Sequence, residues 1–397
     1  MKKKIVFMII NMNVGGTEKA LLNMIAEIPK EKFEITILML EKYGGFLSSI
    51  PAEIKVEYIN DYQNLKDILN NPPHKSALHL LKVGKFKKAF NILITHLISK
   101  ICKDRSIFFN YILKDYPEIN NEYDIAVAYA GPMDFISYFV VNKIKAKKKI
   151  QWIHFDVTKI GFDKHFAAKV YNKFDKVFVV SNEGKHILDK LVPNIKNKTM
   201  NFLNIISPKL VVKMSDEGVG FEDDYEGVRI LTVGRLSKEK GQDLAISVLA
   251  MLRKEGYKVR WYSIGEGGDR KEYEKLINKY KVQDDFILMG SNPNPYPFMK
   301  QCDIYVQPSR HEGYCITLSE ARCFNNPIVS TNFTGATEQI IHDKTGLIVN
   351  FEQQQMCAAI KLLLENRLLR DKLKKNLDNE FVDTRLELNK FIQTLNI

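Results

Sequence analysis

Short apolar runs alternate with helical patterns along all 397 residues of the chain. In the first half the runs are KIVFMII, FEITILML, YDIAVAYA, KKIQWIH and KVFVVS, and in the second half they are RILTVGRL, VRWYSIG, FILMG, DIYVQPS, PIVST and GLIV. Near-continuous runs of this kind are typical of parallel strands that helices cover on both faces. Because the chain is too long for one hydrophobic core, we predict an α/β protein with two doubly wound, Rossmann-like domains, residues 1–206 and 207–378.

One helical pattern is strongly basic. The apolar residues of the segment 85–103 recur at spacings of three and four, which predicts an amphipathic helix. They are Phe86, Ala89, Phe90, Leu93, Leu97 and Ile101. The wider segment 68–103 holds seven lysines and three histidines but no acid. Two interpretations stay open, because the helix either packs on the first domain with a solvated basic face or lies on a membrane surface.

The net charge of +12 comes entirely from the first half of the chain. Residues 1–206 contain 32 Lys and Arg against 20 Asp and Glu, whereas residues 207–397 contain 27 of each. Basic surfaces attract the phosphates of nucleic acids or of anionic lipids. No basic motif interleaved with aromatic residues is visible, so no nucleic-acid partner is expected. The acidic stretch 215–227 is typical of a surface linker or loop.

Features that the sequence lacks indicate the compartment and the cofactors. No apolar run approaches the ~20 residues that span a bilayer, and the run from Ile5 to Ile10 is too short for a signal peptide. The five cysteines lack metal or redox spacing, which favours reduced thiols in a cytosolic protein. Without an Asp-x-Asp motif or a histidine pair at metal spacing, no metal ion or other cofactor is expected.

Candidate binding residues follow the apolar runs, because ligands of such sheets bind beyond the carboxyl ends of the strands. After the first run, Gly15 and Gly16 allow the backbone to approach a ligand closely, and Thr17 can cap the next helix. A tight turn would look the same. After RILTVG, Arg235 and Lys240 could hold a diphosphate from two sides, although an exposed lysine-rich turn would share this pattern.

The stretch EGYCITLSE carries two acids, Glu312 and Glu320. Gly313 and Tyr314 are expected to open a helix, and eight residues correspond to roughly 800° of helix, so both acids can face one cleft. Carboxylates accept hydrogen bonds from vicinal hydroxyl groups, so we interpret one acid as a hexose ligand and the other as a ribose ligand. His154, at the end of KKIQWIH, is either structural or turned toward a cleft between the domains.

Taken together, these motifs resemble glycosyltransferase family four, the retaining GT-B enzymes. The resemblance is strongest over residues 229–350, where VGRLSKEKGQD, SRHEGYCITLSEA, NNPIVST and GATEQIIHDKTGLIV follow in the family's order, and it extends to NVGGTEKALLNMI and WIHFD. It implies two Rossmann-like domains that face each other across a cleft. The first would bind the acceptor and face the membrane, the second would bind the nucleotide sugar, and a helix over 379–397 would cross back to the first domain.

The resemblance also implies a role for each candidate residue. The donor diphosphate would be held by Arg235, Lys240 and Gly16, with Gly16 at the junction of donor and acceptor, and the ribose would be held by Glu320. The catalytic residues would be Glu312, in contact with the donor hexose, and His154, near the reacting carbon. The backbone of Gly313, Tyr314, Cys315 and Ile316 would lie beside the hexose. Family members have no generally accepted enzyme nucleophile, so Glu312 is not assigned as one, and the two cations would stabilise charge on the leaving diphosphate.

Two positions depart from the family pattern. Asn325 stands where glycine is commoner, but asparagine tolerates the left-handed conformation at a helix end. Cys315 stands where glycine or proline is frequent, which leaves the donor sugar open.

The resemblance implies transfer of a hexose or N-acetylhexosamine from a nucleotide diphosphate sugar, with UDP as the expected nucleotide. The acceptor would be a lipid-linked or polymeric surface glycan, as in bacterial capsule, lipopolysaccharide or teichoic acid assembly. A basic first domain fits a cytoplasmic protein at the inner face of the cell membrane. Two alternatives stay open: a GT-B nucleotide-sugar epimerase, which would convert a UDP-sugar without an acceptor, and a non-catalytic protein that binds anionic lipid or nucleic acid.

Overall fold

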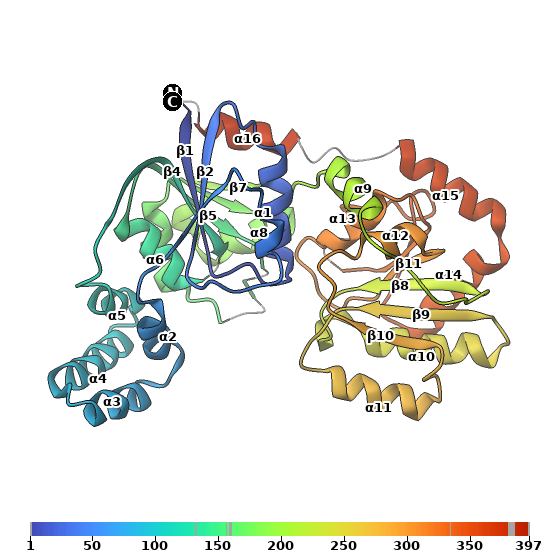
Figure 1. The fold of residues 1–397 in the computed structure, drawn as a ribbon, viewed down its shortest axis with the longest axis horizontal. Coiled ribbons are helices and arrows are strands. Elements are labelled where there is room, and N and C mark those ends of the chain that lie inside the picture. The colour runs from blue at the N-terminus through green and yellow to red at the C-terminus, as the bar shows by residue number, and fades with distance from the viewer. Residues whose placement is uncertain are drawn as a thin grey trace. The chain divides into compact units, whose positions relative to one another are not determined.

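The structure is a computed structural model, and it describes residues 2–131, 133–155, 157–158, 161–333, 335–379 and 386–395. The chain forms two compact units (Figure 1). The first unit comprises Met1–Asn13, Ile28–Phe202 and Ile392–Ile397, and the second comprises Val14–Glu27 and Leu203–Phe391. Within the described residues, no helix is both long and apolar enough to cross a membrane.

The first unit is built on a parallel sheet of seven strands in the order β3-β2-β1-β4-β5-β6-β7. The strands are β1 (Lys3–Ile9), β2 (Phe33–Met39), β3 (Lys55–Tyr58), β4 (Ile119–Gly131), β5 (Ile144–Ile153), β6 (Lys176–Val179) and β7 (Thr199–Asn201). At the centre, Ile5 of β1 lies between Ile35 of β2 and Ile125 of β4, and all three are buried. The five apolar runs predicted as strands are confirmed.

The helices of this unit fall into two groups. Between β4 and β7 the chain forms α6 (Asp134–Lys143), α7 (Lys164–Val170) and α8 (Asn182–Leu191). Between β3 and β4 it forms α2 (Tyr62–Asn70), α3 (Pro73–Lys82), α4 (Phe86–Ile101) and α5 (Arg105–Ile112), which lie together beyond the strands in Figure 1. The basic amphipathic helix predicted from the segment 85–103 is therefore confirmed as α4.

The second unit holds a parallel sheet of six strands in the order β10-β9-β8-β11-β12-β13. They are β8 (Val228–Val233), β9 (Val259–Ile264), β10 (Phe286–Gly290), β11 (Ile304–Gln307), β12 (Ile328–Thr331) and β13 (Leu347–Val349). The α-helices that lie wholly in this unit are α1 (Gly16–Glu27), α9 (Pro208–Asp216), α10 (Gln242–Lys254), α11 (Arg270–Tyr280), α12 (Tyr296–Gln301), α13 (Ile316–Arg322), α14 (Gln353–Glu365) and α15 (Arg367–Asn379). All six predicted strands are present, and two doubly wound α/β units confirm the predicted architecture.

Two segments group differently from the predicted division at 206/207. Residues 14–27 and 203–206 belong to the second unit. One reason is that Asn23 of α1 accepts a hydrogen bond from the Ser207 backbone at 3.0 Å, just before α9. The sequence had suggested Thr17 as the cap of this helix. Because α1 begins at Gly16, Thr17 is instead its second residue.

The final helix, α16 (Leu386–Leu395), lies in the predicted segment 379–397, of which residues 380–385 and 396–397 are outside the described residues. Its end from Ile392 belongs to the first unit, and the part before that belongs to the second. The roles expected of the predicted domains, acceptor binding and membrane contact for the first and donor binding for the second, stay predictions.

The acidic stretch 215–227 is not a linker between the units, because it lies inside the second one. Asp223 in this stretch pairs with Arg229 at 2.8 Å and with Arg260 at 3.0 Å, and it also accepts a hydrogen bond from Tyr262. Partial burial works to raise the pKa of Asp223, but these three donors outweigh it and lower the pKa to about 2. The acid therefore fastens the loop to the neighbouring strands β8 and β9.

This linkage predicts an acid-dependent loss of stability. We expect Asp223→Asn to lower the melting temperature by about 2–4 °C at pH 7, because the two arginines lose their shared carboxylate. A carboxyl group whose pKa falls on folding stabilises the protein above its unfolded pKa, and this stabilisation disappears as the pH falls toward 2. Melting curves of both proteins should therefore converge between pH 4 and pH 2. A constant difference across this range would contradict the assigned role.

Candidate functional site

The loop after β8 positions the two predicted diphosphate ligands. Arg235 is the second residue after β8 and directly follows Gly234. Its exposed guanidinium group forms no ion pair with an acid among the described residues. Lys240 ends a 3₁₀ turn, and its side chain is only 23% exposed. Gln242, at the start of α10, donates to the carbonyl of Arg235 at 3.0 Å and so holds the loop against the helix. The sequence prediction of two cations at this strand end is thus realised in one exposed and one mostly buried side chain.

Gly241 fixes the position of Lys240. Its φ is +74°, and a Cβ atom there would lie 1.9 Å from the carbonyl oxygen of Pro308. A residue with a side chain is excluded, because the loop after β8 packs directly against the backbone that follows β11. This close approach brings Lys240 to the stretch that contains Glu312.

Lys240 and Glu312 form an ion pair in which Nζ lies 2.6 Å from both carboxylate oxygens. Burial alone would lower the pKa of Lys240, but the charge of Glu312 more than offsets this, so the pKa of Lys240 is raised. Ser309 also donates to Glu312 at 2.8 Å. The acid predicted to contact a hexose and the cation predicted to contact a diphosphate therefore lie together.

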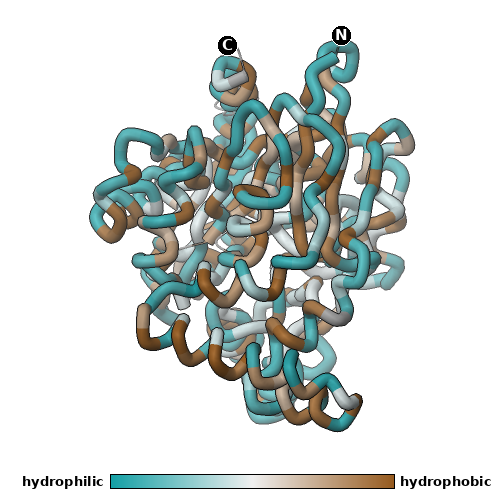
Figure 2. Tube along the Cα trace, turned by 90° about the vertical axis from the view of Figure 1, so that its left-hand side faces the viewer, coloured by the Kyte–Doolittle hydropathy of each residue, from teal (hydrophilic) through white to brown (hydrophobic). Residues whose placement is uncertain are grey.

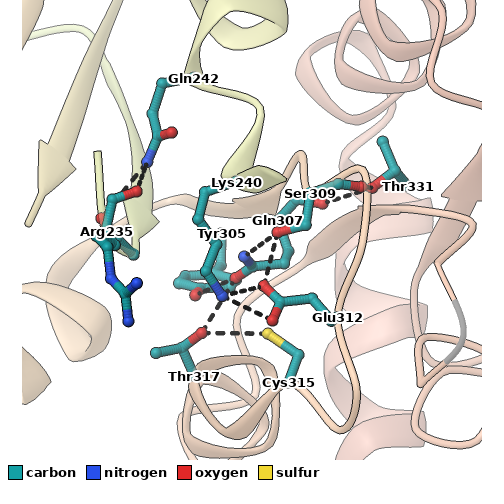
Figure 3. Close-up of polar contacts among 11 residues, drawn as sticks. Arg235, Lys240, Gln242, Tyr305, Gln307, Ser309, Glu312, Cys315, Thr317 and Thr331 are labelled. Carbon is teal, nitrogen blue, oxygen red and sulfur yellow. Dashed lines mark hydrogen bonds and ion pairs between the residues drawn. The ribbon is translucent and has the colours of Figure 1, made fainter. Parts of the chain in front are cut away.

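A chain of buried polar side chains supports this ion pair (Figure 3). Gln307, at the end of β11, donates to Ser309 at 2.9 Å and accepts from Tyr305 at 2.8 Å. Thr331, at the end of β12, donates to the carbonyls of Gln307 and Ser309 at 3.2 and 2.5 Å. Both strand ends therefore orient Ser309, which in turn orients Glu312. Sequence reasoning missed this network, although all four residues lie in runs predicted as strands.

The helix after Glu312 starts later than the sequence predicted. Gly313 and Tyr314 do not open it, because α13 begins at Ile316 with Cys315 as its N-cap. Cys315 contacts Thr317 at 3.2 Å, and burial raises the pKa of this thiol to about 12, so it remains protonated. The backbone of residues 313–316 thus leads into the helix beside the ion pair, where Cys315 is the buried neighbour.

Glu320 lies in a second buried cluster and is 1% exposed. It accepts a hydrogen bond from Tyr296 of α12 at 2.6 Å, and Nζ of Lys19 lies 4.2 Å from the centre of the Tyr296 ring. Burial raises the pKa of Glu320, and Lys19 and Tyr296 work against this rise. Glu320 lies little more than one turn into α13, not the two turns that were predicted. Lys19 and Tyr296 were both missed, because nothing in the sequence links residues so far apart.

The start of α1 lies beside the start of α13. A Cβ atom on Gly16 would meet only the side chain of Ile316, at 3.8 Å, so these two predicted site residues are neighbours. Glu18, two residues after Gly16, was not predicted as a site residue. Burial raises its pKa to about 7, although the positive charge of Arg235 works to lower it. The cluster around Arg235 therefore includes an acid that titrates near neutral pH.

His154 lies in the first unit, just after β5, and is 9% exposed. Its ring packs beside the rings of Tyr129 and Trp152, with centroids 4.5 and 6.1 Å away. Burial lowers the pKa of His154 to about 3, so the ring is neutral at pH 7, and its Nε2 atom has no hydrogen-bond partner among the residues that the structure describes. The structural interpretation explains the packing, and the role of His154 near the donor sugar stays a prediction.

The structure also tests the departures and absences that the sequence indicated. Asn325 follows α13 with a φ of +57°, so the predicted left-handed conformation is confirmed. Among the described residues, no group of three His, Cys, Asp or Glu side chains could hold a metal ion. Independence from metal stays a prediction, because the nucleotide sugar could itself bring a cation to the site.

Comparisons with known proteins agree with this arrangement. Residues 222–379 match the model of the family "Glycosyl transferases group 1". An uncharacterized glycosyltransferase of Methanocaldococcus jannaschii is 27% identical over 181 residues, which cover 44% of each chain. The N-acetylgalactosamine-N,N'-diacetylbacillosaminyl-diphospho-undecaprenol 4-alpha-N-acetylgalactosaminyltransferase of Campylobacter jejuni is 29% identical over 223 residues, which cover 55% of this chain and 57% of the relative. Residues 222–379 thus belong to this glycosyltransferase family.

The solved structure of Anabaena HepE in complex with UDP and glucose has the same fold as this chain. Its TM-score is 0.71 at 17% identity, and the match covers 99% of both chains. The predicted family, the GT-B fold class and the transferase class are confirmed. The chain spans about half the length of the two relatives above, so the reaction of the whole protein is taken up as a proposal.

The ion pair leads to a prediction about stability. Removing one partner of a largely buried pair leaves the other charge uncompensated, so we expect Lys240→Met to lower the free energy of unfolding by about 2–3 kcal/mol. The double variant Lys240→Met/Glu312→Gln should recover most of this loss, because no buried charge remains. Urea unfolding measures both values, and Lys238→Met, at an exposed lysine of the same turn, serves as the control. Additive losses in the double variant would show that the pair is not coupled.

Proposed function

We propose that this protein transfers a hexose or N-acetylhexosamine from a UDP-sugar to a lipid-linked or polymeric surface glycan, with retention of configuration and without a bound metal ion. The observation that carries the proposal is the cluster at the carboxyl ends of β8 and β11. Arg235 is an unpaired cation, Lys240 is a buried one, and Glu312 lies 2.6 Å from Lys240. An arriving diphosphate would find two cations, and a hexose attached to it would find a carboxylate next to them.

For the site residues we propose the roles that the family resemblance implies. Arg235 and Lys240 would neutralise the charge that grows on the leaving diphosphate, which is the task that a metal ion has in other transferases. Glu312 would accept hydrogen bonds from sugar hydroxyls, with the backbone of residues 313–316 beside it. His154 would offer Nε2 of its neutral ring to the donor sugar, and Gly16 would leave room where donor and acceptor meet. Glu320 would bind the ribose.

The printed names of similar proteins support the choice of substrates. The Campylobacter relative is named as a transferase that acts on a diphospho-undecaprenol acceptor, and HepE was solved with UDP and glucose. A polyprenyl diphosphate acceptor is anionic and lies in a membrane, which suits the excess of 32 Lys and Arg over 20 Asp and Glu in residues 1–206. We therefore place the protein in the cytoplasm, bound peripherally to the inner face of the cell membrane.

Nucleotide binding tests the donor site. We expect UDP to raise the melting temperature more than GDP or ADP does, and to do so equally with EDTA, because two side-chain cations hold the diphosphate. The rise should be lost in Arg235→Ala and strongly reduced in Glu320→Gln. Lys271→Ala, at an exposed site on α11, is the control. No shift with any nucleotide would refute the donor site and favour a non-catalytic binding protein, whereas conversion of a UDP-sugar without acceptor would identify an epimerase.

The cluster around Glu320 leads to a sharper prediction about the ribose. A hydroxyl that bonds to a carboxylate contributes about tenfold or more to affinity, so the protein should bind UDP at least tenfold more tightly than 2'-deoxy-UDP. Lys19 works against the rise in the pKa of Glu320. We expect Lys19→Met to reduce this preference, since the carboxyl group would then keep its proton and accept hydrogen bonds less well.

Calorimetric titration of both nucleotides measures the preference. Lys19→Arg should retain it, Glu320→Gln should abolish it, and Lys209→Met, at an exposed lysine of α9, should leave it unchanged. If the unaltered protein does not distinguish the two nucleotides, Glu320 is not a ribose ligand. If only Glu320→Gln loses the preference, Lys19 has no part in positioning that acid.

A further inference from the structure

Exposed apolar side chains are concentrated on the hairpin formed by α3 and α4. Of the twenty-two large hydrophobic side chains that are exposed in the described residues, ten lie within this hairpin. They are Leu78, Leu81, Val83, Phe86, Phe90, Leu93, Ile94, Leu97, Ile98 and Ile101. A soluble domain usually scatters such residues singly, so a group of this size marks an interaction surface. Figure 2 shows the side of the molecule that carries the hairpin, with brown turns alternating with teal ones along the helices at its lower end.

Seven of these side chains form one continuous face of α4. At about 100° per residue, the positions from Phe86 to Ile101 fall within an arc of about 140°. The most exposed are Ile101 at 71%, Phe86 at 68% and Phe90 at 64%. The opposite side of the helix holds Ala89 and Ile92, both 1% exposed. Of the apolar stripe predicted from the sequence, only Ala89 is buried and the other five residues are exposed, so most of the stripe is not the face by which α4 packs on its own domain.

The charge around this face has one sign. The seven lysines of the segment 68–103 form no ion pair with any described residue, and the segment has no acid of its own. Four of them surround the tip of the hairpin, where every residue from Leu81 to Lys88 is exposed. Gly84 makes the tight turn there with a φ of +74°. The tip therefore presents Val83 and Phe86 together with four exposed lysines that flank them in the sequence.

We propose that the hairpin α3–α4 inserts its apolar face into the surface of an anionic lipid bilayer, with its lysines in contact with the lipid phosphates. A long lysine side chain can keep its ammonium group among the headgroups while an adjacent aromatic ring enters the acyl region. A second copy of the chain is a poor occupant, since it would bring seven further lysines against the first seven. The proposal rests on the proposed function, because it supplies the contact by which an enzyme without a membrane-spanning helix in its described part would reach a lipid-linked acceptor.

Sedimentation with lipid vesicles tests the contact. The unaltered protein should bind vesicles that contain phosphatidylglycerol and should not bind pure phosphatidylcholine. Phe86→Ser/Phe90→Ser should weaken this binding at least tenfold, and Lys85→Gln/Lys88→Gln should weaken it roughly fivefold for each lysine removed. Matched controls are Leu368→Ser/Leu386→Ser, at side chains 82% and 67% exposed elsewhere, and Lys271→Gln/Lys275→Gln on α11.

Insertion is distinguished from surface attraction by a fluorescent variant. Trp152 and Trp261 are buried, at 1% and 0% exposure, so Phe90→Trp adds the one tryptophan placed on this face. Its emission should shift to shorter wavelength on phosphatidylglycerol vesicles and should be quenched by lipids brominated in their acyl chains. Binding without quenching would overturn insertion.

Two further outcomes would overturn the proposal without touching the donor site. The first is that the unaltered protein does not bind phosphatidylglycerol vesicles although UDP still raises its melting temperature. The second is a dimer in sedimentation velocity that Phe86→Ser/Phe90→Ser converts to a monomer, since the face would then join two copies of this chain. Loss of the UDP effect in the unaltered protein would instead refute the proposed function, so the two failures are distinguishable.

Discussion

The proposed donor site depends on the charge of Lys240, which the second unit largely buries beside its sheet. Burial works to lower the pKa of Lys240, which is only 23% exposed, and the carboxylate of Glu312 works against this. Their pairing requires the backbones of the loops after β8 and β11 to be in direct contact. Gly241 permits this contact, and a side chain at position 241 would prevent it. The buried side chains of Gln307 and Ser309 are then oriented toward this fixed carboxylate, because Gln307 donates to Ser309 and Ser309 donates to Glu312. The site is thus assembled before any substrate arrives.

A diphosphate would change the partner of Lys240 without removing its charge compensation. In the described state the ammonium group shares its charge with two carboxylate oxygens, each 2.6 Å away. When phosphate oxygens take part of that charge, Glu312 is released to accept hydrogen bonds from sugar hydroxyls. In this proposal the carboxylate would hold the cation in place for the donor and would become a sugar ligand afterwards. Such an exchange costs little, because a charged partner replaces a charged partner.

Local sequence patterns were sufficient for the framework and insufficient for the contacts. All the strands with four or more consecutive apolar residues were found, because parallel strands covered on both faces leave that pattern. The strands β3 (KVEY) and β7 (TMN) were missed, since edge strands are short and mixed in character. The start of α13 was misplaced because Gly313 and Tyr314 extend the loop beside the ion pair. The pairing of Lys19 with the Tyr296–Glu320 cluster is beyond any local pattern, since it joins residues about 280 and 300 positions apart and depends on the packing of α1.

Helical periodicity has a further limit that α4 illustrates. The spacing of three and four identifies an apolar face, but it does not say whether protein or something else covers that face. In α4 the small Ala89 and the single Ile92 are sufficient to dock the helix on its neighbours, and the larger stripe is left exposed. A surface helix in water normally reverses this order, with its large apolar residues inward. The acid-free charge on the same hairpin resolves the discrepancy, because lysines around an exposed apolar face are favourable where an anionic surface meets hydrocarbon and unfavourable where one copy of the chain meets another.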